Sequence, residues 1–217
     1  PDRFTQIIKL RQSHTPKLRT GYDSQRLWRC DARVMTSPVS RAPTLVAMVG
    51  LPGSGKTTRA RELAESLPAI RFTPDEWILP LLEGENPEHV RDVIEGRFVA
   101  VATALLRQGV NVILDFGLWS HDERAGLHSL ALEEGAAFSL DYLAIDRPEQ
   151  WRRVRERQRR SPETTFPMTE QDLDDYDRWF EAPDADEVEG SSLASAPEGA
   201  ESWAAWRAHR WPTADAL

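Results

Sequence analysis

A glycine-rich octapeptide carries the strongest chemical signal in the sequence. Residues 50–57 read Gly-Leu-Pro-Gly-Ser-Gly-Lys-Thr and directly follow a continuous apolar run over 44–49. Glycines let a backbone curl around phosphate oxygens without Cβ clashes, so that successive N–H groups point inward. Lys56 is then expected to reach the β- and γ-phosphates, and the Thr57 hydroxyl to bind Mg²⁺. The segment predicts a phosphate-binding P-loop, or Walker A motif, for a nucleoside triphosphate. The residues of this cradle are Gly50, Leu51, Pro52, Gly53, Ser54, Gly55, Lys56, Thr57 and Thr58.

Asp115 is the second candidate, because it stands where the apolar run 110–114 ends. A carboxylate at that place holds Mg²⁺ through water in the Walker B role. The alternative is a turn residue or helix cap, since aspartate is common after strands; the apolar run and the P-loop favour the metal role. The next residue is Phe116, whereas ATPase motors usually place a glutamate there. The sequence therefore favours phosphoryl transfer to a substrate over hydrolysis.

Asp75 has two competing interpretations. It follows the second predicted strand, where a carboxylate can take the proton from a hydroxyl that attacks the γ-phosphate. It is also the second residue of a helix for which Thr73 and Glu76 predict a capping box, and an acid there is favoured by the helix dipole alone. The sequence leaves general base and helix-terminal acid open.

A basic helix is predicted after the fourth strand, with six arginines in residues 151–160. Arg153 and Arg157 are four residues apart and share a helix face. Arginine forks stabilise the charge that develops on a transferring phosphoryl group, and small P-loop kinases keep a closing lid there. We expect one or two of these arginines to reach the phosphates and the others to be solvated; a nucleic-acid-binding helix is the alternative. Arg124 is a further candidate for a phosphate contact.

Strands and helices must alternate to bring these residues together. The sequence predicts strands at 44–49, 69–72, 110–114 and 138–145, and helices at 56–67, 74–82, 89–108, 122–134, 149–160 and 169–180. This alternation indicates an α/β fold of the P-loop NTPase type, in three α/β/α layers with a mostly parallel sheet and a small helical lid. Ligands bind at the carboxyl ends of such strands, where the P-loop, Asp75 and Asp115 all fall.

Composition limits the partners and the compartment. The chain has 217 residues and a net charge of −8, which disfavours long nucleic acid as a partner. No apolar run is long enough to span a membrane, and the single cysteine, Cys30, excludes disulfides within the chain. We expect a cytoplasmic protein. The predicted domains are a basic, disordered extension over 1–43, a kinase-like domain over 44–187, and a linker with a short C-terminal helix over 188–217.

Taken together, these motifs resemble a known family. The residues that carry the resemblance are the run 50–58, Asp75, Val-Ile-Leu-Asp-Phe-Gly-Leu-Trp-Ser at 112–120, Glu123-Arg124, Trp-Arg-Arg at 151–153, Arg157, Phe166-Pro167 and Phe-Glu-Ala-Pro at 180–183. Over about 44–187 the chain resembles the small P-loop kinases grouped with bacteriophage polynucleotide kinase, zeta toxin and chloramphenicol phosphotransferase, and their branch of predicted kinases. The resemblance implies ATP-dependent phosphorylation of a hydroxyl, with the base at Asp75, the second acid at Asp115 and lid arginines near Arg153 and Arg157. Residues 184–201 depart from it, because they do not predict the further strand that such kinases usually have.

Three functions stay open from the sequence. The leading one is a kinase that uses ATP and Mg²⁺ to phosphorylate a hydroxyl of a small molecule or nucleotide-type substrate. The second is a nucleotide-binding regulatory module that transfers no phosphoryl group. The third is a zeta-toxin-like nucleotide-sugar kinase with an antitoxin-type protein partner, which the sequence does not identify. A GTPase is disfavoured because the Asn-Lys-x-Asp guanine motif does not occur.

Overall fold

A computed structural model describes residues 42–82, 88–190 and 193–214, so most of the predicted basic extension over 1–43 lies outside the described residues. Within them, four parallel strands form one sheet in the order β2-β3-β1-β4. The strands are β1 (Thr44–Val49), β2 (Ala69–Phe72), β3 (Asn111–Gly117) and β4 (Ala137–Tyr142). Leu45 of β1 pairs with Val112 on one side and with Phe138 on the other. The predicted parallel sheet is confirmed.

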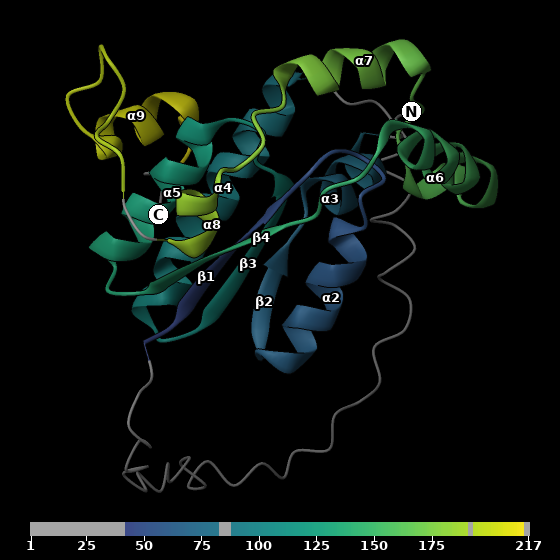
Figure 1. Ribbon diagram of the computed structural model, residues 1–217. Helices are drawn as coiled ribbons and strands as arrows, with labels where there is room; N and C mark the ends of the chain where they lie inside the picture. The colour runs from purple at the N-terminus through teal and green to yellow at the C-terminus, as the bar shows by residue number, and fades with distance from the viewer. Residues whose placement is uncertain (1–41, 83–87, 191–192, 215–217) are drawn as a thin grey trace, which may run out of the picture. The chain divides into compact units, whose positions relative to one another are not determined.

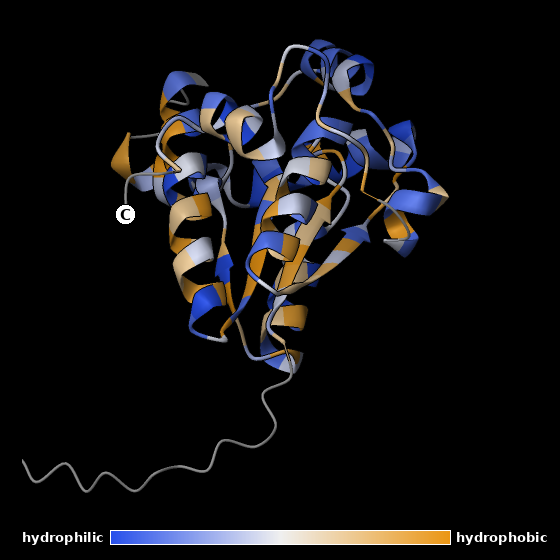
Figure 2. Ribbon diagram, turned by 90° about the vertical axis from the view of Figure 1, so that its left-hand side faces the viewer, coloured by the Kyte–Doolittle hydropathy of each residue, from blue (hydrophilic) through white to orange (hydrophobic). Residues whose placement is uncertain are grey.

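Helices cover both faces of this sheet (Figure 1). Helix α2 (Lys56–Ser66) covers one face, where Val46 and Met48 of β1 pack around Ala60. Helices α4 (Glu88–Arg107) and α5 (His121–Glu133) cover the other face, over the alternate residues of β1. Because side chains along a strand point alternately to the two faces, an all-apolar strand such as β1 must be covered twice. Figure 2 shows the apolar colour concentrated in the strands and polar colour on the outward sides of the helices. The predicted three-layer α/β/α fold is confirmed.

Two further helices lie at the upper end of the sheet in Figure 1, where the strands have their carboxyl ends. These are α6 (Arg147–Arg160) and α7 (Glu170–Trp179), joined through the short 3₁₀ helix η1 (Pro162–Thr164). Strand β3 runs two residues beyond Asp115, which therefore lies within the strand and not after its end. Strand β4 ends at Tyr142, three residues earlier than predicted.

The capping box predicted at Thr73 and Glu76 is wrong. Helix α3 (Pro74–Leu81) begins with proline in its first turn as expected, but no side chain caps it. The Thr73 hydroxyl instead donates to Oδ2 of Asp115 at 3.2 Å, and Glu76 accepts hydrogen bonds from Arg71 and Arg61. Charge-assisted hydrogen bonds are stronger than those to a neutral backbone N–H, so the two side chains are drawn away from the helix end.

The C-terminal region is more ordered than the predicted linker. Residues 185–189 form helix α8 (Ala185–Glu189), which contacts β4, and no fifth strand occurs in the described part of the chain. Helix α9 (Trp203–Arg210) forms as predicted and packs on α5. The residue after it, Trp211, is completely buried in the same apolar cluster as β1. None of the described helices is long and apolar enough to cross a membrane.

The burial of Trp211 predicts a large effect of its truncation. We expect Trp211→Ala to lower the free energy of unfolding by about 3–5 kcal/mol, because removing a buried tryptophan leaves a cavity in the core. Urea denaturation measures the loss. Trp179→Ala is the matched control, since the Trp179 side chain is 63% exposed and its removal should change stability by about 0.5 kcal/mol or less. Equal losses in the two variants would contradict a structural role for the C-terminal segment.

Candidate functional site

The glycine-rich segment forms a tight loop between β1 and α2. Gly50 and Gly53 have φ angles of 143° and 81°, which residues with a Cβ atom rarely adopt. A Cβ atom at Gly50 would also lie 2.6 Å from the carbonyl oxygen of Leu143. Directly after the loop, α2 begins at Lys56, so the positive end of its dipole and its free N–H groups face the loop. This geometry suits a phosphate group.

Lys56 lies inside this loop. Its ammonium group donates a hydrogen bond to the carbonyl of Leu51 at 2.9 Å. Desolvation lowers the pKa of Lys56 to about 8, although the negative charges of Asp115 and Asp75 raise it. Both carboxylates therefore lie close enough to act on the same ammonium group. Asp115 and Asp75 thus lie within electrostatic range of Lys56.

Asp115 is affected by Thr57, the P-loop residue that is expected to bind metal. Its side chain is 2% exposed and lies 3.5 Å from the guanidinium of Arg71, it accepts a hydrogen bond from the hydroxyl of Thr73, and the hydroxyl of Thr57 also acts on its pKa. Burial raises the pKa of Asp115, while Lys56 and these hydrogen bonds lower it. A hydroxyl beside a carboxylate is an oxygen pair that suits Mg²⁺, which takes few protein ligands and completes its shell with water and phosphate oxygens. The described residues contain no cluster of three or more histidine, cysteine or acidic side chains that could hold a metal alone.

Asp75 lies in the first turn of α3, as both of its interpretations expect. Its Oδ1 atom accepts a hydrogen bond from Nη2 of Arg91, a residue of α4, at 2.5 Å. Its charge also acts on Tyr176 of α7, whose pKa is raised by burial first and by nearby carboxylates second. Asp75 thus joins α3 to α4 through Arg91.

Arg153 of α6 lies against the P-loop, and Arg157 acts on its lysine through charge. Nη1 of Arg153 is 3.4 Å from the Gly53 carbonyl and 3.3 Å from the Ser54 carbonyl. The charge of Arg157 acts on Lys56, and its guanidinium donates to the carbonyl of Thr164 at 3.0 Å. These are the two residues that the helix periodicity selected.

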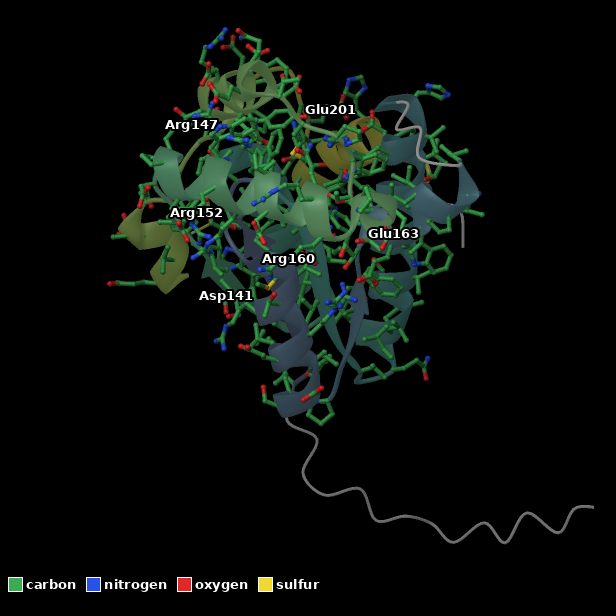
Figure 3. The ribbon with its side chains drawn as sticks, turned by 90° about the vertical axis from the view of Figure 1, so that its right-hand side faces the viewer. Asp141, Arg147, Arg152, Arg160, Glu163 and Glu201 are labelled. Atoms are coloured by element: carbon green, nitrogen blue, oxygen red, sulfur yellow. The ribbon has the colours of Figure 1, made fainter. Side chains whose placement is uncertain are left out.

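Arg147 pairs with Asp174 of α7, whereas the remaining arginines of α6 have partners on their own helix. Figure 3 shows Arg147, Arg152 and Arg160 spread along this helix. Arg152 pairs with Glu149, and Arg160 pairs with Glu156. The guanidinium of Arg155 lies 5.6 Å from the ring centre of Trp151. These contacts agree with the expectation that most arginines of this helix lie at its solvated surface.

The side-chain nitrogens of Arg124 bind partners outside the P-loop. Its side chain is 1% exposed, and Nε and Nη2 donate to the two carboxylate oxygens of Glu187 in α8. Nη1 donates to the carbonyls of Leu118 and Trp119 at 3.1 Å each. These bonds give Arg124 a structural role at the turn after β3, in place of the expected phosphate contact, because its hydrogen-bond donors are already committed to these partners.

Two buried polar atoms have no partner within the described part of the chain. They are Oγ of Ser54 and Nε2 of Gln150. Ser54 belongs to the P-loop, and the backbone of Gln150 in α6 lies 3.2 Å from the ideal Cβ position of Gly53. Buried polar groups are nearly always satisfied, so an unpaired hydroxyl in the loop suits a ligand with hydrogen-bonding oxygens.

A cavity of about 240 Å³ adjoins the P-loop at Leu51. The ends of β4 and α7 line its other sides. Its lining residues are Leu51, Tyr142, Leu143, Ala144, Ile145, Asp177, Phe180 and Ala182. The loop is therefore open to a bound molecule on this side.

Sequence reasoning missed the two arginines that contact the acids of the site. Arg71 lies in the short strand β2, and Arg91 lies on a helix that the sequence marks only by its apolar period. Neither belongs to a motif, and their contacts with Asp115 and Asp75 join segments that are far apart in the sequence. Only the fold reveals them.

Comparisons with known proteins agree with this geometry. A family model described as an AAA domain matches residues 45–183. No curated protein matches the chain. A chain of the Pnkp1/Rnl/Hen1 RNA repair complex is similar, with a TM-score of 0.54 and 21% identity over 67% of this chain and 46% of that one. This chain thus spans less than half the length of that protein.

Two other solved structures share the fold. Chaetomium thermophilum Kti12 in complex with ADP-AlF3 has a TM-score of 0.52 and 20% identity, over 64% of this chain and 81% of that one. A provisionally assigned kinase from Chloroflexus aurantiacus has a TM-score of 0.52 and 17% identity, over 73% of this chain and 85% of that one. At these identities the likeness concerns the fold. The resemblance to the group of P-loop kinases is confirmed.

The lowered pKa of Lys56 predicts a pH dependence of nucleotide binding. Phosphates need the charged ammonium, and above pH 8 the free protein must first take up a proton at Lys56. We expect the affinity for ATP to fall by up to about tenfold for each pH unit above 8. Calorimetric titration in buffers of different ionisation enthalpy measures both the affinity and the proton uptake. Lys56→Arg is the control, because its guanidinium stays charged and should remove this dependence.

Proposed function

The chain belongs to the AAA-domain family, and on this premise we propose that it binds ATP with Mg²⁺ and transfers the γ-phosphoryl group to a hydroxyl. The acceptor is a hydroxyl of a small molecule or nucleotide-type substrate. The observation that carries the proposal is that the charges of Asp115 and Asp75 both act on the ammonium group of Lys56. A phosphate-binding lysine, a candidate metal carboxylate and a candidate base at one point are the parts that phosphoryl transfer requires.

Each residue has a distinct role in this proposal. The backbone N–H groups of the P-loop and the Lys56 ammonium bind the phosphates, while Thr57 and Asp115 hold Mg²⁺. Bound ATP with Mg²⁺ supplies an activated phosphoryl group with neutralised charge. Asp75 accepts the proton of the attacking hydroxyl at Oδ2, because Arg91 binds its other oxygen, Oδ1.

The arginines of α6 supply positive charge beside the phosphates. Arg153 lies on the outer side of the loop and Arg157 near Lys56, where guanidinium groups stabilise charge on the equatorial oxygens of a transferring phosphoryl group. We assign Arg124 a positioning role, since its bonds to Leu118 and Trp119 hold the turn that follows Asp115. The ADP-AlF3 bound in the Kti12 structure supports ATP as the ligand of this chain only because the two proteins share a fold.

Replacing the candidate base should separate transfer from binding. We expect Asp75→Asn to lower label transfer from γ-labelled ATP to a panel of hydroxyl acceptors by at least about a hundredfold, because it removes a general base. Nucleotide-induced thermal stabilisation should persist, since the P-loop is intact. Asp184→Asn is the matched control, because asparagine caps a helix as well as aspartate does and Asp184 caps α8.

Two outcomes of this assay would count against the proposal. Equal label transfer by wild type and Asp75→Asn would rule out the base assignment. ATP hydrolysis without transfer to any acceptor, at equal rates in both proteins, would favour the regulatory nucleotide-binding module instead.

Removing the phosphate-binding lysine tests the central claim directly. We expect Lys56→Ala to abolish the rise in melting temperature that ATP and Mg²⁺ cause in the wild type, because ligand stabilisation follows the occupancy of the site. Differential scanning fluorimetry across ATP concentrations measures it. Unchanged stabilisation in Lys56→Ala would show that nucleotide binds elsewhere or not at all.

A further inference from the structure

The C-terminal segment, residues 203–213, is attached to the middle of helix α4. The Thr213 hydroxyl donates to the carbonyl of Val93 at 2.7 Å. A Cβ atom at Gly96 would lie 2.4 Å from this hydroxyl oxygen, so the segment crosses α4 where a glycine leaves room. Trp211 is fully buried beside it. These contacts fix the segment next to the residues of α4 that lead to Asp75.

Arg210 connects three acidic side chains at this junction. Its Nη1 atom lies 2.7 Å from Asp92. Its Nη2 atom lies 2.7 Å from Glu123 of α5 and 3.3 Å from Glu95 of α4. Glu95 is only 6% exposed, so it depends on its partners for charge compensation.

Glu95 is shared between two arginines. Arg210 binds its Oε2 atom, and Nη1 of Arg91 lies 3.7 Å from its Oε1 atom. The other terminal nitrogen of Arg91 holds Asp75 at 2.5 Å. An unbroken series of charge contacts therefore runs from Arg210 through Glu95 and Arg91 to Asp75.

Opposing effects on the pKa of Glu95 make this series of contacts sensitive to the loss of one partner. Burial raises the pKa of Glu95 to about 7, while Arg210 and Arg91 lower it, Glu123 raises it and the hydrogen bond from Trp211 lowers it. Asp92 faces the same junction through Arg210. Without Arg210, an ionised Glu95 keeps Arg91 as its remaining basic partner in this junction, and Arg91 cannot satisfy Glu95 fully while it also holds Asp75.

We propose that Arg210 is a positioning residue for Asp75: by binding Glu95 it leaves Arg91 free to hold the Asp75 carboxylate in one orientation. The C-terminal segment thereby becomes part of the acceptor side of the site, although it lies outside the matched family region over 45–183. The catalytic meaning of Asp75 rests on the proposed function; the series of contacts does not.

The test compares two arginines of the same helix. Arg207 also anchors α9 to α5, with 3.2 Å to the carbonyl of Gly126 and 2.5 Å to Glu133, and none of these contacts involves Glu95. We expect crystal structures to show the contact between Arg91 and Asp75 lost in Arg210→Met and kept in Arg207→Met. Glu95→Gln removes the charge that would compete with Asp75 for Arg91, so it should keep the contact by itself and restore it in the double variant Arg210→Met/Glu95→Gln. Arg210→Lys should restore the contact in part.

Kinetic measurements of kcat and KM give a result that a loss of stability alone would not change. In Arg210→Met, kcat for label transfer should fall about tenfold through misorientation of the base, with an unchanged KM for ATP. In Arg210→Met this loss should grow as the pH rises and Glu95 ionises, because the charged carboxylate then competes with Asp75 for Arg91, and the double variant Arg210→Met/Glu95→Gln should lack this step. Arg207→Met should keep the wild-type kcat and pH profile.

The outcomes separate this inference from the proposed function. A retained contact between Arg91 and Asp75 in Arg210→Met overturns the inference, as does equal loss of the contact in Arg207→Met or a loss that Glu95→Gln does not restore in the double variant. If the wild type transfers label to no acceptor, the proposed function fails, and the crystal structures still decide whether Arg210 positions Asp75.

Discussion

The juxtaposition of a desolvated lysine and a buried carboxylate is the constraint on which the rest of the site depends. Lys56 begins the helix that follows β1, and Asp115 lies near the carboxyl end of the neighbouring strand β3, so the sheet order β2-β3-β1-β4 sets their proximity. Isolated charges are expensive to bury, and each of these two moderates the cost for the other. The hydroxyl of Thr73 satisfies a further lone pair of Asp115. A ligand that brings both negative oxygens and a divalent cation matches both charges at once, which is the balance that a metal–triphosphate complex offers.

Helices and turns on several sides of Lys56 and Asp115 restrict the positions of these two residues. Helix α6 lies so close to the P-loop that a Cβ atom at Gly53 would meet the side chain of Val154 at 3.2 Å. The turn after β3 is held by Arg124, and the backbone N–H of Glu181, just past α7, donates to the carbonyl of Trp119 in that turn at 2.9 Å. The backbone at the carboxyl edge is thus tied to helices that lie far along the chain. Preorganised donors act more strongly on developing charge than mobile ones do, so this bracing is consistent with a site built for chemistry.

Much of this arrangement could be predicted from the sequence because the signals were local. The apolar run over 44–49 and the glycines after it determine strand and loop within one short segment, and the helix period selects Arg153 and Arg157 by spacing alone. The failures concern side chains whose partners are remote. The capping box at Thr73 is a valid local pattern, but the fold brings a buried carboxylate from β3 to the threonine hydroxyl. Arg124 is close to Asp115 in the sequence, yet Glu187 of α8 binds it, and the sequence predicts no helix over residues 185–189.

The acidic and basic groups between Asp75 and Arg210 illustrate why such remote contacts favour arginine. Arg91 uses one terminal nitrogen for Asp75 and the other for Glu95, and Arg210 divides its nitrogens among carboxylates of α4 and α5. A lysine offers a single point of charge on a flexible stem, whereas the planar guanidinium fixes the direction of each contact. Because each arginine lies between carboxylates, moving one guanidinium changes the surroundings of the next acid along the series. The orientation of Asp75 is therefore a property of the whole series, and it depends on residues that only the folded chain brings together.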